Sequence, residues 1–147
     1  MANPNINQGI LNRLLTSLSV TGNPGLNVSA PYLGKGGIVW TPQGQATIPL
    51  PTLTGLAMSP EPYMQITVHM SLLKSQALCE SYLQQIESNT LLGDCVFRSD
   101  SSAIGSRTLN NTAIEGFNEI TANGQVIEVV FALSGIWQIN SSLYSAL

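Results

Sequence analysis

Residues 64–72 read MQITVHMSL, and their pattern indicates the class of fold. Apolar and polar side chains alternate throughout this stretch. Successive side chains of a strand point to opposite sides, so this alternation is typical of a β-strand with one buried face. We therefore predict a strand here. Its core face carries Ile66, Val68 and Met70, and its other face carries Gln65, Thr67, His69 and Ser71.

A second alternating stretch lies near the end of the sequence, where residues 127–139 read IEVVFALSGIWQI. The pattern predicts a long strand whose core face carries Ile127, Val129, Phe131, Leu133 and Trp137. The opposite face of this strand carries Glu128, Ser134 and Gln138. The preceding Asn123-Gly124 pair favours a type I′ turn, so it predicts a hairpin that leads into this strand.

The rest of the chain predicts one helix and several short strands. Residues 74–87 lack Gly and Pro and place apolar side chains three to four positions apart, which indicates an amphipathic helix. Short strands are expected at 95–98 and 113–117, and the Gly- and Pro-rich residues 26–56 are typical of strands joined by long loops. Residues 10–18 also show helical spacing and are interpreted as an arm or a short helix. We therefore expect a mainly β fold, a β-sandwich or barrel with one flanking α-helix.

The composition disfavours several classes of protein. A length of 147 residues is common for one domain, so we expect a single domain over residues 1–147. Only 9% of the residues are charged, which suggests a surface largely covered by other subunits. A net charge of -3 and five basic residues disfavour a protein that grips nucleic acid. The start has no basic segment followed by a long apolar run, so neither secretion nor membrane insertion is expected.

Few residues carry the chemistry of a catalytic or metal site. His69 is the single histidine and is interpreted as a surface or interface residue. Cys79 and Cys95 show no metal or redox spacing and are expected to be buried free thiols. Residues 34–37 (GKGG) lack the Walker spacing and are interpreted as a flexible turn. The acids expected to be solvated are Glu115, Glu119 and Glu128. We predict no catalytic residue, no cofactor and no metal ion.

Four strings, taken in order, carry a resemblance to a known family. They are MANPNINQGILN at 1–12, LLKSQA at 72–77, NTLLGD at 89–94 and GIWQIN at 135–140. With this order and spacing the chain resembles the tail tube proteins of long-tailed bacteriophages, and a contractile tail is the expected type. The resemblance runs from the N-terminus through the final strand.

The resemblance implies a structural protein that catalyses nothing. The family fold would be a β-sandwich with a flanking helix, and subunits would form six-fold rings whose inner strands join into one continuous barrel. The rings would stack along the tail of the virion after assembly in the host cytoplasm. The implied partners are the protein itself, the sheath, and the tape-measure, baseplate and tail-terminator proteins.

The resemblance also implies where subunits meet and where DNA passes. An N-terminal arm at about 1–20, a long inter-subunit loop at about 41–62 and residues 141–147 would contact neighbouring subunits and rings. Neutral and acidic groups in the lumen would repel phosphate, so DNA would pass without specific binding. Alternation alone marks the candidate lumen residues as Gln65, Thr67, His69, Ser71, Glu128, Ser134 and Gln138.

Two other functions stay open beside the phage tail tube. The related tube of a bacterial secretion machine has the same ring-forming fold. A monomeric β-sandwich that binds a small ligand or glycan could use Trp40, Tyr63 or Trp137 as a stacking platform. An enzyme is the weakest alternative, because no set of residues combines a nucleophile, a base and an oxyanion donor.

Overall fold

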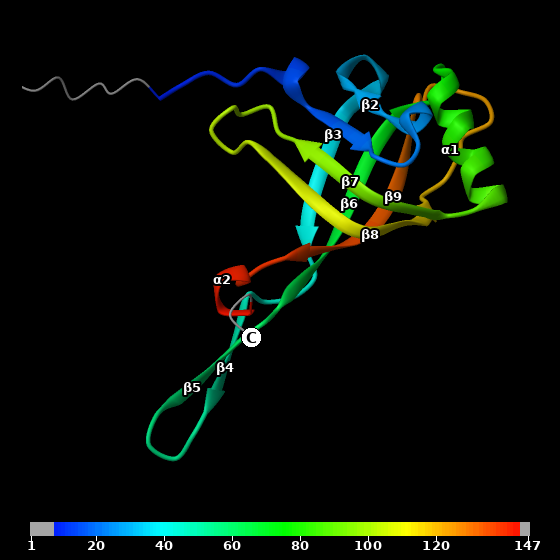
Figure 1. Cartoon of the computed structure of the whole chain (residues 1–147). Helices are drawn as coiled ribbons and strands as arrows, with labels where there is room; N and C mark the ends of the chain where they lie inside the picture. The colour runs from blue at the N-terminus through cyan, green and yellow to red at the C-terminus, as the bar shows by residue number, and fades with distance from the viewer. Residues whose placement is uncertain (1–7, 145–147) are drawn as a thin grey trace, which may run out of the picture.

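The computed structural model describes residues 8–144, which form a seven-stranded sheet, a two-stranded hairpin, one longer helix and several short ones (Figure 1). The sheet has the order β2-β1-β7-β8-β9-β6-β3, is antiparallel throughout and curls around an apolar core. Its strands are β1 (Ser17–Val20), β2 (Val28–Ser29), β3 (Leu33–Pro42), β6 (Tyr63–Leu73), β7 (Leu91–Arg98), β8 (Ser106–Phe117) and β9 (Glu128–Gln138). The predicted fold class is confirmed: the chain is mainly β, and one long helix, α1 (Ala77–Ser88), flanks the curled sheet.

The two alternating stretches form β6 and β9, which pair with one another along their whole length. Val68 lies opposite Leu133, and Met70 lies opposite Phe131. All four side chains are fully buried, because the period of two places them together on the face that α1 and the curled sheet enclose. The two strands predicted from alternation are therefore present.

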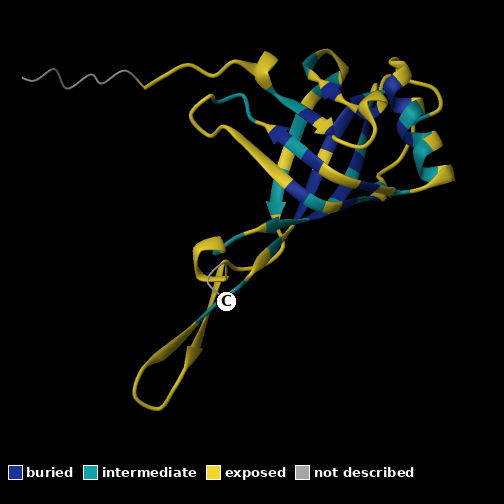
Figure 2. Ribbon diagram, in the orientation of Figure 1, coloured by how far each residue is buried: buried dark blue, intermediate teal, exposed yellow. Residues whose placement is uncertain are grey.

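Most of the core candidates lie in this core (Figure 2). Six of them are at most 1% exposed: Ile66, Val68, Met70, Val129, Phe131 and Leu133. Trp137 is half-buried and packs against the same cluster. The prediction for Ile127 was wrong, since its side chain is 48% exposed. Ile127 precedes the last β6–β9 pair, at Glu128, so no strand opposite it completes its burial.

The helix α1 covers the core through its buried residues Leu78, Cys79 and Tyr82. The Tyr82 ring lies 5.6 Å from the ring of Phe131, and its hydroxyl donates to the carbonyl of Leu26 at 2.7 Å. A buried hydroxyl needs such a partner, because an unpaired one costs about 1–3 kcal/mol. The helical spacing in 74–87 therefore marked a real helix, which begins three residues later than predicted and ends one residue later.

The predicted loop at 41–62 contains a second, separate sheet. β4 (Thr47–Pro51) and β5 (Leu56–Pro60) pair antiparallel and extend away from the main sheet as a hairpin (Figure 1). We call residues 47–60 the hairpin arm. Nearly all of its side chains are exposed, as Figure 2 shows.

Two predictions about local structure were wrong. The helical stripe at 10–18 contains only a 3₁₀ turn, η1 (Arg13–Leu15), and the chain then enters β1, where Leu18 and Val20 are buried two residues apart. Residues 1–7 of the expected arm lie outside the described range. The Asn123-Gly124 pair does not form a two-residue hairpin turn, because β8 and β9 pair across a ten-residue connection at 118–127.

The remaining elements are short. η2 (Pro24–Leu26) and η3 (Ala30–Tyr32) join β1, β2 and β3, and α2 (Ser141–Tyr144) follows β9. The short strands expected at 95–98 and 113–117 are the ends of β7 and β8, which are both longer than predicted. Residues 145–147, the end of the segment expected to make stacking contacts, lie outside the described range.

Candidate interaction surfaces

The outer faces of β3, β6, β8 and β9 form one surface, which we call the open face. It contains every residue predicted to line a lumen. Gln65, His69 and Gln138 are exposed, whereas Ser134 and Glu128 are half-buried. Thr67 and Ser71 are only 7% exposed, because each lies in the middle of the sheet between paired strands.

Hydrogen bonds join polar side chains across the open face. Thr67 and Ser134 are cross-strand partners whose hydroxyl oxygens lie 3.5 Å apart. Ser134 also donates to the carboxylate of Glu115 on β8. The expectation that Glu115 is solvated agrees with its exposure, but the carboxylate has a defined partner on the sheet.

Sequence reasoning missed that the open face is also partly apolar. Val130, Ala132 and Ile136 occupy the outer positions of β9 and are half-buried, and Val39 on β3 is 50% exposed. A strand that is apolar on both faces is typical of a sheet covered on both sides. The signal was present in the sequence as the near-continuous apolar run at 129–133.

The free edges of the sheet are β2 and β3, so the sheet does not close into a barrel by backbone pairing. Trp40 on β3 meets Phe97 on β7 with ring centroids 5.5 Å apart, so side chains fill the gap between the two ends of the curl. Within residues 8–144, no strand pairs with the N–H and C=O groups along the outer side of β3. Such an edge is a template for pairing with another chain.

The edge strand β3 carries a bulge where a flexible turn was expected. Residues 34–37 belong to the strand, and the register with β6 shifts between Leu33 and Ile38. The carboxylate of Glu128 accepts the backbone N–H of Lys35, and a Cβ at Gly34 would overlap that carboxylate. A Cβ at Gly36 would lie 2.5 Å from the Ser71 hydroxyl. The glycines therefore allow close approach between strands.

The hairpin arm presents apolar side chains to the solvent and has no charged residue. The exposed fractions of its large apolar residues run from 38% to 102%, in Ile48, Leu50, Leu53, Leu56 and Met58. The C-terminal segment, residues 140–144, contacts the base of the arm. Its Asn140 side-chain amide donates to the carbonyls of Ala46 at 3.2 Å and Glu61 at 2.7 Å. Contiguous exposed apolar surface of this kind marks interaction sites.

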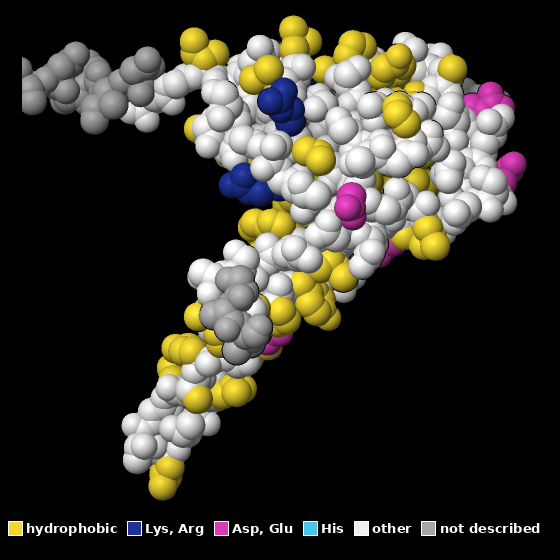
Figure 3. Space-filling view, viewed as in Figure 1, with side chains coloured by type: hydrophobic (Ala, Val, Ile, Leu, Met, Phe, Trp, Pro, Cys, Tyr) yellow, Lys and Arg dark blue, Asp and Glu magenta, His cyan; other side chains and the backbone are white. Residues whose placement is uncertain are grey.

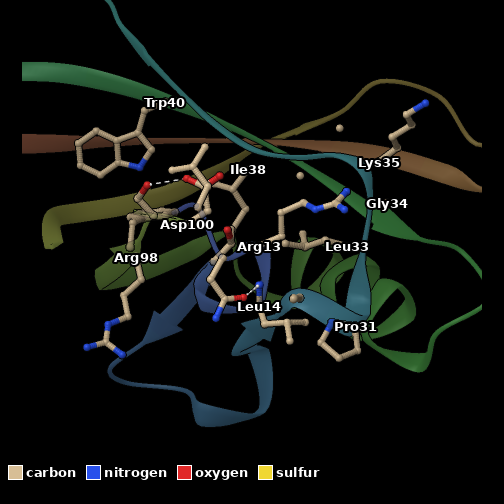
Figure 4. Close-up of a pocket in the computed structure, with 18 of the residues that line it drawn as sticks. Arg13, Leu14, Pro31, Leu33, Gly34, Lys35, Ile38, Trp40, Arg98 and Asp100 are labelled. Atoms are coloured by element: carbon tan, nitrogen blue, oxygen red, sulfur yellow. Dashed lines mark hydrogen bonds between the residues drawn. The ribbon is translucent and has the colours of Figure 1, made fainter. Parts of the chain in front are cut away.

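A cavity of about 1380 Å³ opens between the start of β3, the end of β7 and η1. Leu33, Ile38, Trp40 and Phe97 contribute apolar side chains to its wall. Figure 4 shows the side chains of Lys35 and Arg98 reaching outward from different sides of the cavity. Trp40 is not a free stacking platform, because it also contacts Trp137 at a centroid distance of 5.9 Å.

The two cysteines are buried in the core, whereas His69 is exposed on the open face. Cys79 and Cys95 are free and buried, and burial raises the pKa of both thiols. His69 borders a shallow hollow with Glu115, Phe117 and Val130. Within residues 8–144, no group of three or more His, Cys, Asp or Glu side chains could hold a metal ion. No helix in this range has the length and apolarity needed to cross a membrane.

Comparison with known proteins adds no assignment. No protein-family model matches the chain, and no curated protein sequence is significantly similar to it.

Proposed function

We propose that the protein is a non-catalytic structural subunit of a bacteriophage tail tube, which forms six-fold rings that stack into a hollow conduit for DNA. The observation that carries this proposal is the unclosed sheet. Its edge strand β3 is ten residues long and, in the described part of the chain, has a neighbouring strand on one side only. Joining such edges between subunits would close one large barrel and remove the exposed edges.

The open face supports a role as the lining of that barrel. Among the seven lumen candidates the one carboxyl group belongs to Glu128, and Glu115 adds a second carboxyl group beside Ser134. No Lys or Arg is among these residues. Phosphate would find no cation to bind there, so DNA could slide past without the contacts that slow its passage.

The hairpin arm supports contacts between subunits or rings. The uncharged arm exposes five large apolar side chains to water, which is unfavourable. Covering them with a neighbouring subunit would lower the free energy of the assembly. In the proposed tube, the arm and the C-terminal segment that clamps its base contact adjacent copies. The sheath, tape-measure, baseplate and tail-terminator proteins are the further partners proposed in the virion.

Electron microscopy of the purified protein over a concentration series tests the proposal. Rings or hollow tubes of uniform diameter are the expected result. A matched variant carries Leu50→Ser, Leu53→Ser and Leu56→Ser in the arm, and should fold as the wild type but assemble less. Featureless monomers at every concentration, also with baseplate or tape-measure proteins added, would overturn the proposal.

The tube of a bacterial secretion machine would use the same geometry. The neighbouring genes distinguish it from a phage tail tube. Secretion genes, rather than sheath and tape-measure genes, would surround the coding sequence. A monomeric ligand-binding module would use the cavity at Trp40. A protein that remains monomeric and binds glycans in an array would favour that function.

A further inference from the structure

We propose that two oppositely charged surfaces of this chain bind one another between copies, head to tail. The first is the basic rim of the cavity, formed by Arg13, Lys35, Arg98 and Arg107. The second is the acidic surface, formed by Glu80, Glu87 and Glu119. This inference rests on the proposed tube function and names the surfaces that would join neighbouring subunits within one ring.

The basic rim gathers four of the five Lys and Arg residues of the chain around one cavity. All four are exposed, and they come from η1, β3, β7 and β8. The two carboxylates at the same cavity already have partners: Asp100 accepts from the Ser99 hydroxyl at 3.1 Å, and Glu128 accepts from the Lys35 backbone. The rim therefore has a net positive charge, since it carries four cationic side chains and two carboxylates that already accept hydrogen bonds.

The acidic surface lies on α1 and the 118–127 connection. Glu80 and Glu87 are the only charged residues of α1, are both exposed, and lie about two helical turns apart on one side. The Lys74 ammonium group donates to the carbonyl of Thr121 at 2.6 Å, which ties the connection to the start of α1. Glu119 is two residues before that carbonyl and is exposed.

The basic rim and α1 lie on different sides of the molecule. In Figure 3 the Lys and Arg side chains lie on the left, and Asp or Glu side chains lie at the right edge, where Figure 1 places α1, as well as in the middle of the view. Surfaces on different sides of one subunit cannot meet within it, but they can meet between copies. A repeated head-to-tail contact closes into a ring when the rotation between copies allows it.

Both surfaces also carry the apolar groups that an interface needs. Ile104 at the cavity is 54% exposed, and Ile120 in the connection is 41% exposed. Exposed ion pairs alone contribute little affinity, about 0–1 kcal/mol each. The charges would therefore set the register and speed of association, while apolar burial supplies most of the affinity.

Charge reversal and charge exchange test the inference. One variant carries Arg98→Glu and Arg107→Glu, and the other carries Glu80→Lys and Glu87→Lys. Each alone should associate at least about tenfold more weakly than wild type in sedimentation, because like charges then face one another. Their equimolar mixture should associate, since each altered surface then faces its complement.

About 0.5 M salt should weaken association in this mixture, because salt screens the attraction between the charges. Asp94→Lys, an exposed reversal on β7 outside both surfaces, is the control.

The outcomes separate this inference from the tube proposal. Wild-type tubes that persist unchanged in both reversal variants would overturn the inference and leave the tube intact. A mixture that associates in sedimentation, although the wild type never forms rings, would support the inference and overturn the tube. A mixture that stays monomeric, while both variants keep wild-type circular dichroism and urea midpoints, would also overturn the inference.

Discussion

The carboxylate of Glu128 on β9 reaches past β6 and accepts the backbone N–H of Lys35 on β3, at 2.5 Å. Gly34 makes this contact possible, because a side chain there would occupy the position of the carboxylate. Three neighbouring strands are therefore tied together at the mouth of the cavity. The bulge in β3 has a fixed partner and is not a flexible turn.

We expect Gly34→Ala to destabilise the fold by about 0.5–1.5 kcal/mol, because the added Cβ would overlap the Glu128 carboxylate and force it to give up the hydrogen bond from the Lys35 backbone N–H. In a Glu128→Ala background the same substitution should cost much less, which makes the pair a double-mutant cycle. Urea unfolding of the four proteins measures the coupling. Gly44→Ala, which meets no atom within 4 Å, is the control. Additive effects would contradict the contact.

Tyr82→Phe is expected to destabilise the protein by about 1–3 kcal/mol, because it leaves the buried carbonyl of Leu26 without its donor. The aromatic packing on Phe131 is kept, so the loss reports the hydroxyl alone. Tyr63→Phe is the matched control at a side chain that is 52% exposed, and it should be close to neutral. Equal effects of the two substitutions in urea unfolding would show that the buried bond adds nothing.

Stability should fall at alkaline pH, and Tyr82 should account for part of the fall. Burial, and to a lesser extent Cys95, raises the pKa of Tyr82 far above its usual range. The unfolded chain releases this proton near pH 10 while the folded chain keeps it, so the stabilisation is full below about pH 10 and is lost as pH rises further. Each such group adds a slope of at most about 1.4 kcal/mol per pH unit. Urea unfolding at rising pH should show a shallower fall in Tyr82→Phe, whereas an unchanged slope would contradict the assignment.

Phe131 inside β9 and Ile127 just before that strand make a direct comparison of burial. Phe131→Ala should cost about 3–5 kcal/mol, because the ring is fully buried among Tyr82, Phe117 and the core aliphatic residues. Ile127→Ala should cost less than about 1 kcal/mol, because half of that side chain is in water. Thermal and urea unfolding check both. A large effect at Ile127 would mean that a neighbouring element covers it in solution.

The spacing of apolar residues along the sequence predicted the two long strands and the helix α1. The alternation at 64–72 and 129–137 is sufficient for β6 and β9, and the apolar spacing in 74–87 is sufficient for α1. It could not predict which strands pair, because the order places β7 and β8 between β1 and β9. Such pairings depend on loop paths and on side-chain fit across the core.

The wrong predictions at 10–18 and at Ile127 have physical causes that cannot be read from local sequence. Leu18 fits both the helical stripe at 10–18 and a strand in which Val20 lies two positions later, and only pairing with β7 selects the strand. Ile127 continues the alternation of β9 but lies beyond its last paired residue. The surfaces depend on tertiary placement too: four cations that are far apart in sequence meet at one cavity only after folding.

Asn140 controls the base of the hairpin arm. Its side-chain amide donates to Ala46 and Glu61, and its φ of 54° is a conformation that asparagine and glycine tolerate. Asn140→Gly should therefore keep the backbone and remove both hydrogen bonds. Amide hydrogen exchange in the arm, followed by mass spectrometry, should become about tenfold faster, because its base opens more often.

Asn111→Gly supplies the control for this last experiment, since Asn111 also has a positive φ, of 52°, and is exposed on β8. It should leave exchange in the arm unchanged. If both variants speed exchange in the arm equally, loss of an asparagine at positive φ, rather than the clamp, is responsible. If neither does, pairing between β4 and β5 alone orders the arm, and the C-terminal segment is free to move without releasing it.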